Sequence, residues 1–142
     1  MSEAVYTSPL AHLEDTRDAA NLSISMSEVS DRGMIDLRGE AGSVKFRQAA
    51  KAALGMDLPL KPRSSAVNGD VTVLWLSVDQ WLVCCPRTRA GTLVDKLRNN
   101  LVDIHSLAVD VSDARAIIRL EGDTVREVLM KGSSIDFTLP EY

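Results

Sequence analysis

The stretch over residues 71–86, Val-Thr-Val-Leu-Trp-Leu-Ser-Val-Asp-Gln-Trp-Leu-Val-Cys-Cys-Pro, constrains the fold more than any other part of the chain. It holds both tryptophans, both cysteines and the densest apolar run. Residues 71–76 and 81–85 are rich in bulky apolar residues, and the short polar connection between them is typical of a β-hairpin. Neither arm alternates cleanly between apolar and polar residues, so we expect both faces to be covered at least in part. We interpret this stretch as the central hairpin of a domain that combines helices and strands.

The rest of the chain predicts strands and helices on both sides of this hairpin. Residues 22–29 alternate with a period of two, which indicates a half-exposed strand. Ser8 and Pro9 resemble a helix start, with Ser8 as N-cap and Pro9 at the first helical position. Apolar spacing, caps and glycine stops predict further strands over residues 34–38, 108–111 and 116–120, helices over residues 44–54, 88–100 and 122–131, and an extended segment over residues 135–137.

An internal repeat organises these elements. Residues 30–58 and residues 112–137 share one order, which is Ser-Asp, strand, glycine, helix, glycine and return, and the central hairpin with its helix is a third ββα unit. Repeated ββα units predict an α+β fold in which helices cover a mainly antiparallel sheet. We expect a single domain over residues 1–142, with a flexible N-terminus at 1–7 and an internal loop at 60–69. The second copy would return into the sheet at residues 135–142, which leaves open a truncated C-terminal unit.

Composition and charge exclude several classes of function. The formal charge is -4 and the basic residues are scattered, which argues against nucleic acid or an anionic membrane as partner. No apolar stretch is long enough to span a membrane, and acidic residues in the first twenty positions argue against a signal peptide. The thiols of Cys84 and Cys85 suit a reducing compartment, so we expect a cytoplasmic protein.

The candidate reactive side chains lack the spacing of a known site. Adjacent thiols on a strand point to opposite faces and rarely form a disulfide, and no CxxC or Cys/His spacing accompanies them. We therefore interpret Cys84 and Cys85 as small buried strand residues rather than a redox or metal site. Neither His12 nor His105 has metal-triad or nucleophile-pair spacing, and each is interpreted as a surface or capping histidine.

Acidic, glycine-rich, aromatic and basic groups offer weaker candidates. Asp110 and Asp113 could act as paired carboxylates, although Asp at a strand end is routinely a turn residue. The loop at residues 39–42 precedes a helix and could hold an anion, but Glu40 opposes that and favours a tight connection. The remaining candidates are Trp75 and Trp81, as core or stacking platform, and Arg115 and Arg119, as a solvated face or a charged subunit contact. We therefore predict no catalytic, cofactor-binding or metal-binding residues in this chain, which is typical of a structural or binding partner.

Three motifs resemble a known family. Residues 73–83, Val-Leu-Trp-Leu-Ser-Val-Asp-Gln-Trp-Leu-Val, are similar to the "LWLGPDEWLL" motif of the gamma subunit of heterotetrameric sarcosine oxidase. Residues 109–116, Val-Asp-Val-Ser-Asp-Ala-Arg-Ala, resemble that family's "VDVSDGRA", and residues 118–136 resemble its "IRLSGPRAREVLAKGCPIDL". The order and spacing of these motifs hold over most of residues 8–137. The departures are Val78 where proline is usual, Gln80 where glutamate is usual and Ser133 where cysteine is frequent.

The resemblance implies a fold and a function. The fold would be a diverged relative of the folate-binding aminomethyltransferase fold. The chain would be a non-catalytic gamma subunit that packs on and stabilises the alpha subunit, with beta and delta subunits beside it. Such a complex oxidatively demethylates sarcosine to glycine, transfers the one-carbon unit to tetrahydrofolate and produces hydrogen peroxide. FAD, FMN, NAD, tetrahydrofolate and zinc would belong to the other subunits.

Two other classes of function stay open at this point. The first is a free-standing folate-binding or aminomethyltransferase-like module, which would need Asp110 or Asp113 to face the folate. The second is a small regulatory ligand-binding domain built from ββα repeats. For a partner surface, the region around Leu10 and the segment at residues 60–69 are the candidates, because each carries apolar residues outside the main elements.

Overall fold

The structure of the chain is a computed structural model that describes residues 7–8, 10–12 and 23–139. The predicted flexible segment at residues 1–7 lies outside the described residues except for Thr7. Of the predicted N-terminal helix, the described part is a short turn at residues 10–12, where the Leu10 N–H donates to Ser8 Oγ at 3.1 Å. The chain divides into two compact units, which we call the sheet unit (residues 31–115) and the ribbon unit (residues 1–30 and 116–142). The sequence predicted a single domain over residues 1–142, and this stays a prediction, because a division into compact units by contacts does not test it.

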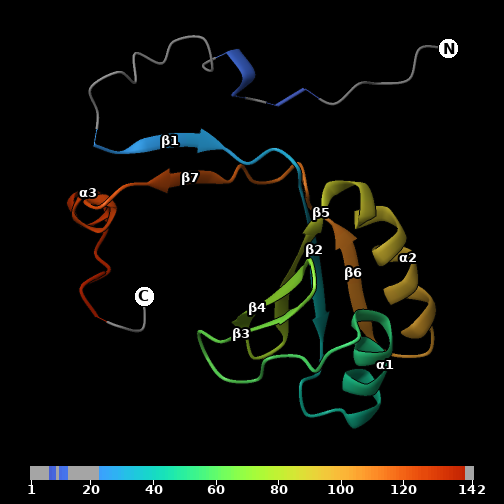
Figure 1. The fold of residues 1–142 in the computed structure, drawn as a ribbon. Helices are drawn as coiled ribbons and strands as arrows, with labels where there is room; N and C mark the ends of the chain where they lie inside the picture. Colours follow the sequence, from blue (N-terminus) through green and yellow to red (C-terminus); the bar gives the residue numbers. More distant parts are fainter. Residues whose placement is uncertain (1–6, 9, 13–22, 140–142) are drawn as a thin grey trace, which may run out of the picture. The chain divides into compact units, whose positions relative to one another are not determined.

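The sheet unit is built on five antiparallel strands in the order β3-β4-β5-β2-β6 (Figure 1). Its two helices, α1 and α2, pack against each other and cover one face of the sheet. In chain order the elements are β2 (Arg32–Gly39), α1 (Val44–Leu54), β3 (Ser65–Asn68), β4 (Val71–Ser77), β5 (Gln80–Pro86), a 3-10 turn (Arg87–Arg89), α2 (Ala90–Asn100) and β6 (Ser106–Asp110).

The predicted central hairpin is confirmed as β4 and β5. Val73 lies opposite Val83 and Trp75 opposite Trp81, and the register shifts between Trp75 and Ser77 next to the turn. Both strands have neighbours on their outer sides, because β3 pairs with β4 and β2 pairs with β5. The hairpin therefore lies in the interior of the sheet, as its apolar sequence requires.

Side-chain alternation along the strands places the core between the sheet and the helices. Ile35 and Leu37 of β2, together with Val83 of β5, are fully buried on the helix side. The helices contribute residues spaced by three or four positions, as an apolar helix face requires. The core residues that the helices contribute are Phe46, Ala50, Ala53 and Leu54 from α1 and Ala90, Leu93, Val94 and Leu97 from α2.

The ends of α1 follow the sequence prediction. Ser43 Oγ accepts a hydrogen bond from the Phe46 N–H at 3.2 Å, which is an N-cap. Gly55 ends the helix at φ 74°, a left-handed conformation that glycine adopts without steric cost. The predicted cap of α2 is wrong: Thr88 lies in the 3-10 turn, and α2 begins at Ala90 without a side-chain cap.

The ribbon unit contains β1 (Ser25–Glu28), β7 (Ile118–Glu121) and α3 (Val125–Gly132). β1 and β7 form a two-stranded antiparallel ribbon in which Met26 lies opposite Leu120. Helix α3 has no buried residue, whereas α1 and α2 bury four each. A two-stranded ribbon is by itself only marginally stable in water.

Several elements differ from their predicted bounds: β7 begins at Ile118 rather than at residue 116, and α3 runs from Val125 through Gly132 rather than over residues 122–131. Residues 60–69 were expected to form an irregular loop, but they contain β3, which pairs with β4 through a tight turn at Gly69. The predicted strand at residues 22–29 is shorter and spans Ser25–Glu28. The extended segment predicted for residues 135–137 is wrong, because Asp136 Oδ1 accepts hydrogen bonds from the N–H and hydroxyl of Thr138 and closes a turn there.

The two copies of the internal repeat exchange strands. The strand that precedes the Ser-Asp turn of copy one, β1, pairs with β7 of copy two. The strand that precedes the Ser-Asp turn of copy two, β6, pairs with β2 of copy one. The result is the predicted α+β architecture with antiparallel sheets, and the described residues include three α-helices. None of the helices in the described chain is both long and apolar enough to cross a membrane.

Candidate functional site

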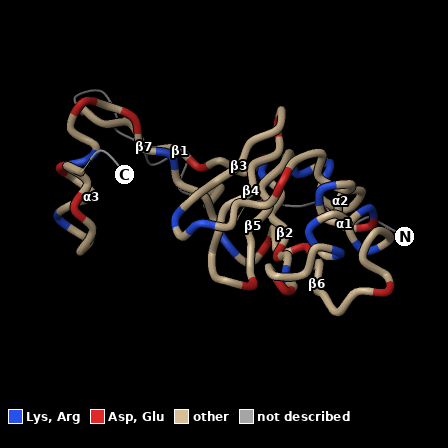
Figure 2. Tube along the Cα trace, turned by 90° about the horizontal axis from the view of Figure 1, so that it is seen from below, with Lys and Arg blue, Asp and Glu red and all other residues tan. Residues whose placement is uncertain are grey.

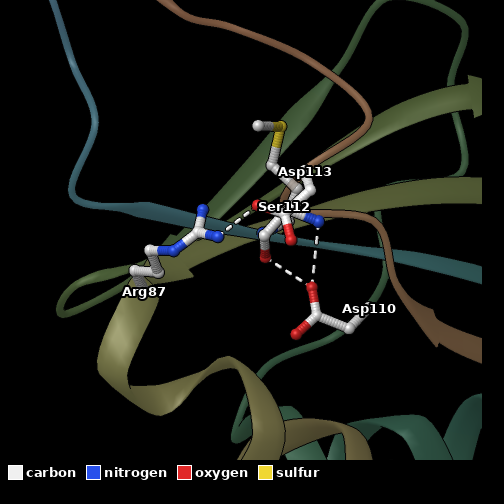
Figure 3. A network of polar contacts seen from close by, with 5 residues as sticks. Arg87, Asp110, Ser112 and Asp113 are labelled. Carbon is white, nitrogen blue, oxygen red and sulfur yellow. Dashed lines mark hydrogen bonds and ion pairs between the residues drawn. The ribbon is translucent and has the colours of Figure 1, made fainter. Parts of the chain in front are cut away.

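Asp110 and Ser112 hold the turn that follows β6 (Figure 3). The carboxylate of Asp110 accepts hydrogen bonds from both the N–H and the hydroxyl of Ser112. The Ser112 hydroxyl in turn accepts a hydrogen bond from the Met34 N–H of β2 at 2.9 Å. Ser112 and Met34 are both buried, where an amide without a hydrogen-bond partner is costly. The Ser112 hydroxyl supplies the acceptor that the Met34 amide needs. The carboxylate of Asp110 therefore has a structural role in this turn.

Asp113 joins the same turn to the end of β5. Its carboxylate forms an ion pair with the guanidinium of Arg87 (Figure 3). The backbone N–H of Arg87 donates to the Asp31 carbonyl oxygen at 2.7 Å. The side chain of Asp113 is 76% exposed, so solvent screens this pair and its contribution to stability is small. Asp110 and Asp113 thus do not form the pair of carboxylates that acid–base chemistry would use, since each has its own structural partner.

A mixed-charge cleft of about 590 Å³ lies where β2 ends, β4 turns into β5 and β6 begins. It brings together Glu40 and His105, which the sequence analysis considered separately, with Arg38 and Asp79, which it missed. The Arg38 guanidinium donates to Gln80 Oε1 at 3.0 Å, and Gln80 Nε2 donates to Asp36 Oδ1 at 2.8 Å. The cleft contains one cation and two carboxylates beside a histidine, without a nucleophile held by a base. Its full lining is Arg38, Gly39, Glu40, Asp79, His105, Ser106 and Leu107.

Gly39 explains the glycine-rich loop before α1. A Cβ at Gly39 would lie 2.3 Å from a ring carbon of Phe46, so only glycine lets the aromatic ring lie over the strand. The N-terminus of α1 is capped by Ser43. These contacts support the tight connection that the sequence favoured over an anion site.

The two cysteines lie on opposite faces of β5. Cys85 is fully buried in the core beneath the helices, while Cys84 is half-buried opposite Met34 and Thr72 on the other face. Burial raises the pKa of both thiols, so both are held in the protonated, unreactive form at neutral pH. Both thiols are free.

The remaining candidates are dispersed. Trp81 is fully buried, and its indole N–H donates to the Pro59 carbonyl oxygen at 2.7 Å. Its ring packs on Phe46 with the ring centroids 5.6 Å apart, so the predicted core role of Trp81 is confirmed. Trp75 is only partly buried. Arg115 and Arg119 fall in different units, and His12 is exposed in the turn at residues 10–12. Within the described residues, no three His, Cys, Asp or Glu side chains are placed to hold a metal ion.

Charge is distributed along the chain rather than gathered. Within each unit, Lys and Arg are interspersed with Asp and Glu along the part of the chain that the structure describes (Figure 2).

Comparison with known proteins gives consistent matches. The sequence model described as "Sarcosine oxidase, gamma subunit family" matches residues 38–142. A curated relative, sarcosine oxidase subunit gamma of Corynebacterium sp. (strain U-96), is 32% identical over an alignment 142 residues long. The alignment covers 95% of this chain and 67% of that protein.

Solved structures agree with the sequence matches. A chain in the solved structure of heterotetrameric sarcosine oxidase from Corynebacterium sp. U-96 in complex with pyrrole 2-carboxylate matches with a TM-score of 0.82 and 29% identity. The match covers 92% of this chain and 68% of that one. Glycine cleavage system aminomethyltransferase T from Bartonella henselae matches with a TM-score of 0.60 and 16% identity, over 76% of this chain and 31% of that one. The second likeness concerns the fold alone, and it confirms the predicted relation to the aminomethyltransferase fold.

Proposed function

Since this chain belongs to the sarcosine oxidase gamma subunit family, we propose that it is the gamma subunit of a heterotetrameric sarcosine oxidase. In this proposal it packs on the alpha subunit and stabilises it, and it supplies no catalytic residue. The match over residues 38–142 carries the proposal. The complex would oxidatively demethylate sarcosine to glycine, transfer the one-carbon unit to tetrahydrofolate and reduce oxygen to hydrogen peroxide.

The internal use of the candidate carboxylates supports a non-catalytic role. Asp110 is engaged by Ser112, and Asp113 by Arg87. Neither residue lines the cleft at the end of β2. FAD, FMN, NAD and tetrahydrofolate would accordingly be bound by the alpha, beta and delta subunits, and this chain would contribute surface and shape.

Co-expression of the other three subunits with and without this chain tests the proposal. We expect the mass of the assembled complex and its sarcosine-dependent peroxide production to fall together when the chain is omitted. Full assembly and full activity without the chain would refute the proposal.

Asp110→Asn and Asp113→Asn are matched variants that separate a structural role from a catalytic one. An amide oxygen at position 110 still accepts the Ser112 N–H, and the exposed pair at Asp113 contributes little to folding. We expect both variants to assemble and to support at least half of the wild-type activity. Normal assembly with activity reduced by a hundredfold or more would assign catalysis to the carboxylate.

The alternative is a free-standing folate-binding or aminomethyltransferase-like module, and the fold likeness to aminomethyltransferase T keeps it in view. It requires a carboxylate that faces a folate, whereas the carboxylates of Asp110 and Asp113 are engaged in turn contacts. Calorimetric titration of tetrahydrofolate into the isolated chain distinguishes the two functions. An accessory subunit gives no heat of binding, and a folate module gives a saturable one.

A further inference from the structure

Strand β6 is an edge of the five-stranded sheet, because it pairs with β2 alone. The Val111 N–H donates to the Met34 carbonyl at 2.8 Å, so residues 34 and 111 form a hydrogen-bonded pair. Such pairs alternate along an antiparallel ladder, which makes 36–109 and 38–107 the next hydrogen-bonded pairs. The N–H and C=O groups of Ser106, Ala108 and Asp110 therefore point away from β2, toward the open edge.

A groove follows this open edge. It has a volume of about 240 Å³, which is below the range of pockets for small-molecule ligands and suits an inserted side chain. Val102 and Leu107, which are 77% and 43% exposed, form its apolar rim. Arg98 of α2 lies in the groove and donates from Nε to the outward carbonyl of Ala108 at 2.9 Å. The other linings are Leu101, Ile104, Ser106 and Ala108.

The β6 edge carries few of the features that protect edges from pairing. Lysine, proline and bulges normally protect edge strands, and β6 reads Ser-Leu-Ala-Val-Asp. The opposite edge strand, β3, is one residue shorter, and the cleft of about 340 Å³ beside α1 and α2 includes only its last residue, Asn68. Asn68 at its end is engaged with the last carbonyls of α1. Of these two edges, β6 is the better template for an added strand.

We propose that β6 accepts an extended strand from another subunit of the complex, which adds a sixth strand to the sheet. Backbone bonds to Ser106, to Asp110 and to the Ala108 N–H would supply affinity, while the Ala108 carbonyl keeps its bond from Arg98. The groove would supply specificity by taking an apolar side chain. Arg98 selects for an acidic residue on the incoming strand, because its guanidinium is the cationic group of the groove. This inference rests on the proposed function, since it names the contact by which the chain joins its partner.

Charge argues for a different subunit rather than a second copy of this chain. In a symmetric antiparallel pairing of two β6 strands centred on Ala108, the two copies of Arg98 would meet near the centre. Like charges at a desolvated contact are unfavourable, whereas an acidic partner strand complements the same site. The groove therefore fits a heterologous strand better than its own copy.

Hydrogen exchange of the assembled complex and of the isolated chain tests the location of the contact. We expect peptides that cover residues 104–111 to exchange at least tenfold more slowly in the complex, and peptides that cover β3 to stay unchanged. A complex that forms while residues 104–111 exchange at the same rate would overturn this inference and leave the proposed function intact. Failure of the subunits to assemble would overturn both. Protection of residues 104–111 that rises with the concentration of the isolated chain would identify a second copy as the occupant, against the proposal.

Ala108→Pro tests the backbone contact directly. The Ala108 N–H points outward, so proline removes a donor to the partner without removing a bond to β2. We expect affinity for the other subunits to fall about tenfold or more, because a buried acceptor on the partner loses its donor. Val67→Pro is the matched control: the Trp75 N–H bonds the Ser64 carbonyl, so the Val67 N–H points outward at the opposite edge. Equal effects of the two prolines would contradict the proposal.

Arg98→Glu keeps the test decisive if proline at position 108 unfolds the chain. Arg98 is exposed, and its reversal changes the charge of the groove without altering the core. We expect weaker assembly at low ionic strength, with the difference from wild type narrowing as salt is added. Unchanged assembly at low salt would refute the role of Arg98.

Discussion

Replacing Trp81 by phenylalanine is expected to destabilise the chain by about 2–5 kcal/mol. Trp81 is fully buried, and its indole nitrogen is 2.7 Å from the Pro59 carbonyl. Phenylalanine cannot donate that hydrogen bond, and a buried acceptor left without a donor costs about 1–3 kcal/mol. The smaller ring also leaves space beside Phe46, which adds about 1–2 kcal/mol through lost burial and a partial cavity.

Trp75→Phe is the matched control for this prediction. Trp75 lies opposite Trp81 on β4, but it is only partly buried, and its indole N–H donates to no described residue. We expect a cost below about 1 kcal/mol for this variant, because no buried partner is left unsatisfied. Urea unfolding followed by far-UV circular dichroism compares the variants with one probe, while the single remaining tryptophan reports on its own site. Equal losses for the two variants would refute the reasoning, because the hydrogen bond and the burial at Trp81 would then contribute nothing.

Three further predictions follow from single contacts. Gly39→Ala should destabilise the chain by about 1–3 kcal/mol, because the added Cβ would meet the Phe46 ring. Gly91→Ala should stabilise it by about 0.5–1 kcal/mol, because position 91 on α2 has open space around it. Thermal unfolding compares the two variants, and midpoint temperatures that shift in the same direction would contradict this reasoning. Ser112→Ala should cost about 1–3 kcal/mol in urea unfolding, because it removes the acceptor of a buried β2 amide; no loss would show that the amide has another acceptor. Burial raises the pKa of the Cys85 thiol above its ordinary value of 9.0, so the free energy of unfolding should fall as the pH rises beyond that value. In Cys85→Ala this fall should be smaller, as measured by urea unfolding midpoints between pH 8 and 11. An equal fall in wild type and variant would exclude the Cys85 thiol as its cause.

The elements predicted best from sequence are those whose local pattern and tertiary environment agree. The two apolar runs at residues 71–76 and 81–85 form β4 and β5. Helix α1 begins after the predicted N-cap Ser43 and ends at the predicted glycine stop, Gly55. Strand β3 was missed because Ser-Ala-Val-Asn has little intrinsic strand preference. The Asn68-Gly69 pair beside Val71 was the signal that could have revealed it, since Asn-Gly between two strands is typical of a tight hairpin.

The candidate site was harder to predict because its residues come from separate parts of the chain. Arg38, Asp79 and His105 line one cleft only because β2 pairs with both β5 and β6. Sequence spacing treated Asp110 and Asp113 as a possible pair of carboxylates. Their actual partners, Ser112 and Arg87, are set by the turn after β6 and by the end of β5.

The exchange of strands between the repeats is the feature that sequence spacing could not provide. Adjacent strands in sequence usually pair, so two ββα copies predict two local hairpins. Here β1 pairs with β7 and β6 pairs with β2. The exchange moves β6 beyond β2, to the outside of the sheet, where its second edge has no partner strand in the described chain. The exchange thus decides which strand β6 lies beside, and the inferred contact with a partner strand uses the edge of β6 that this pairing with β2 leaves open.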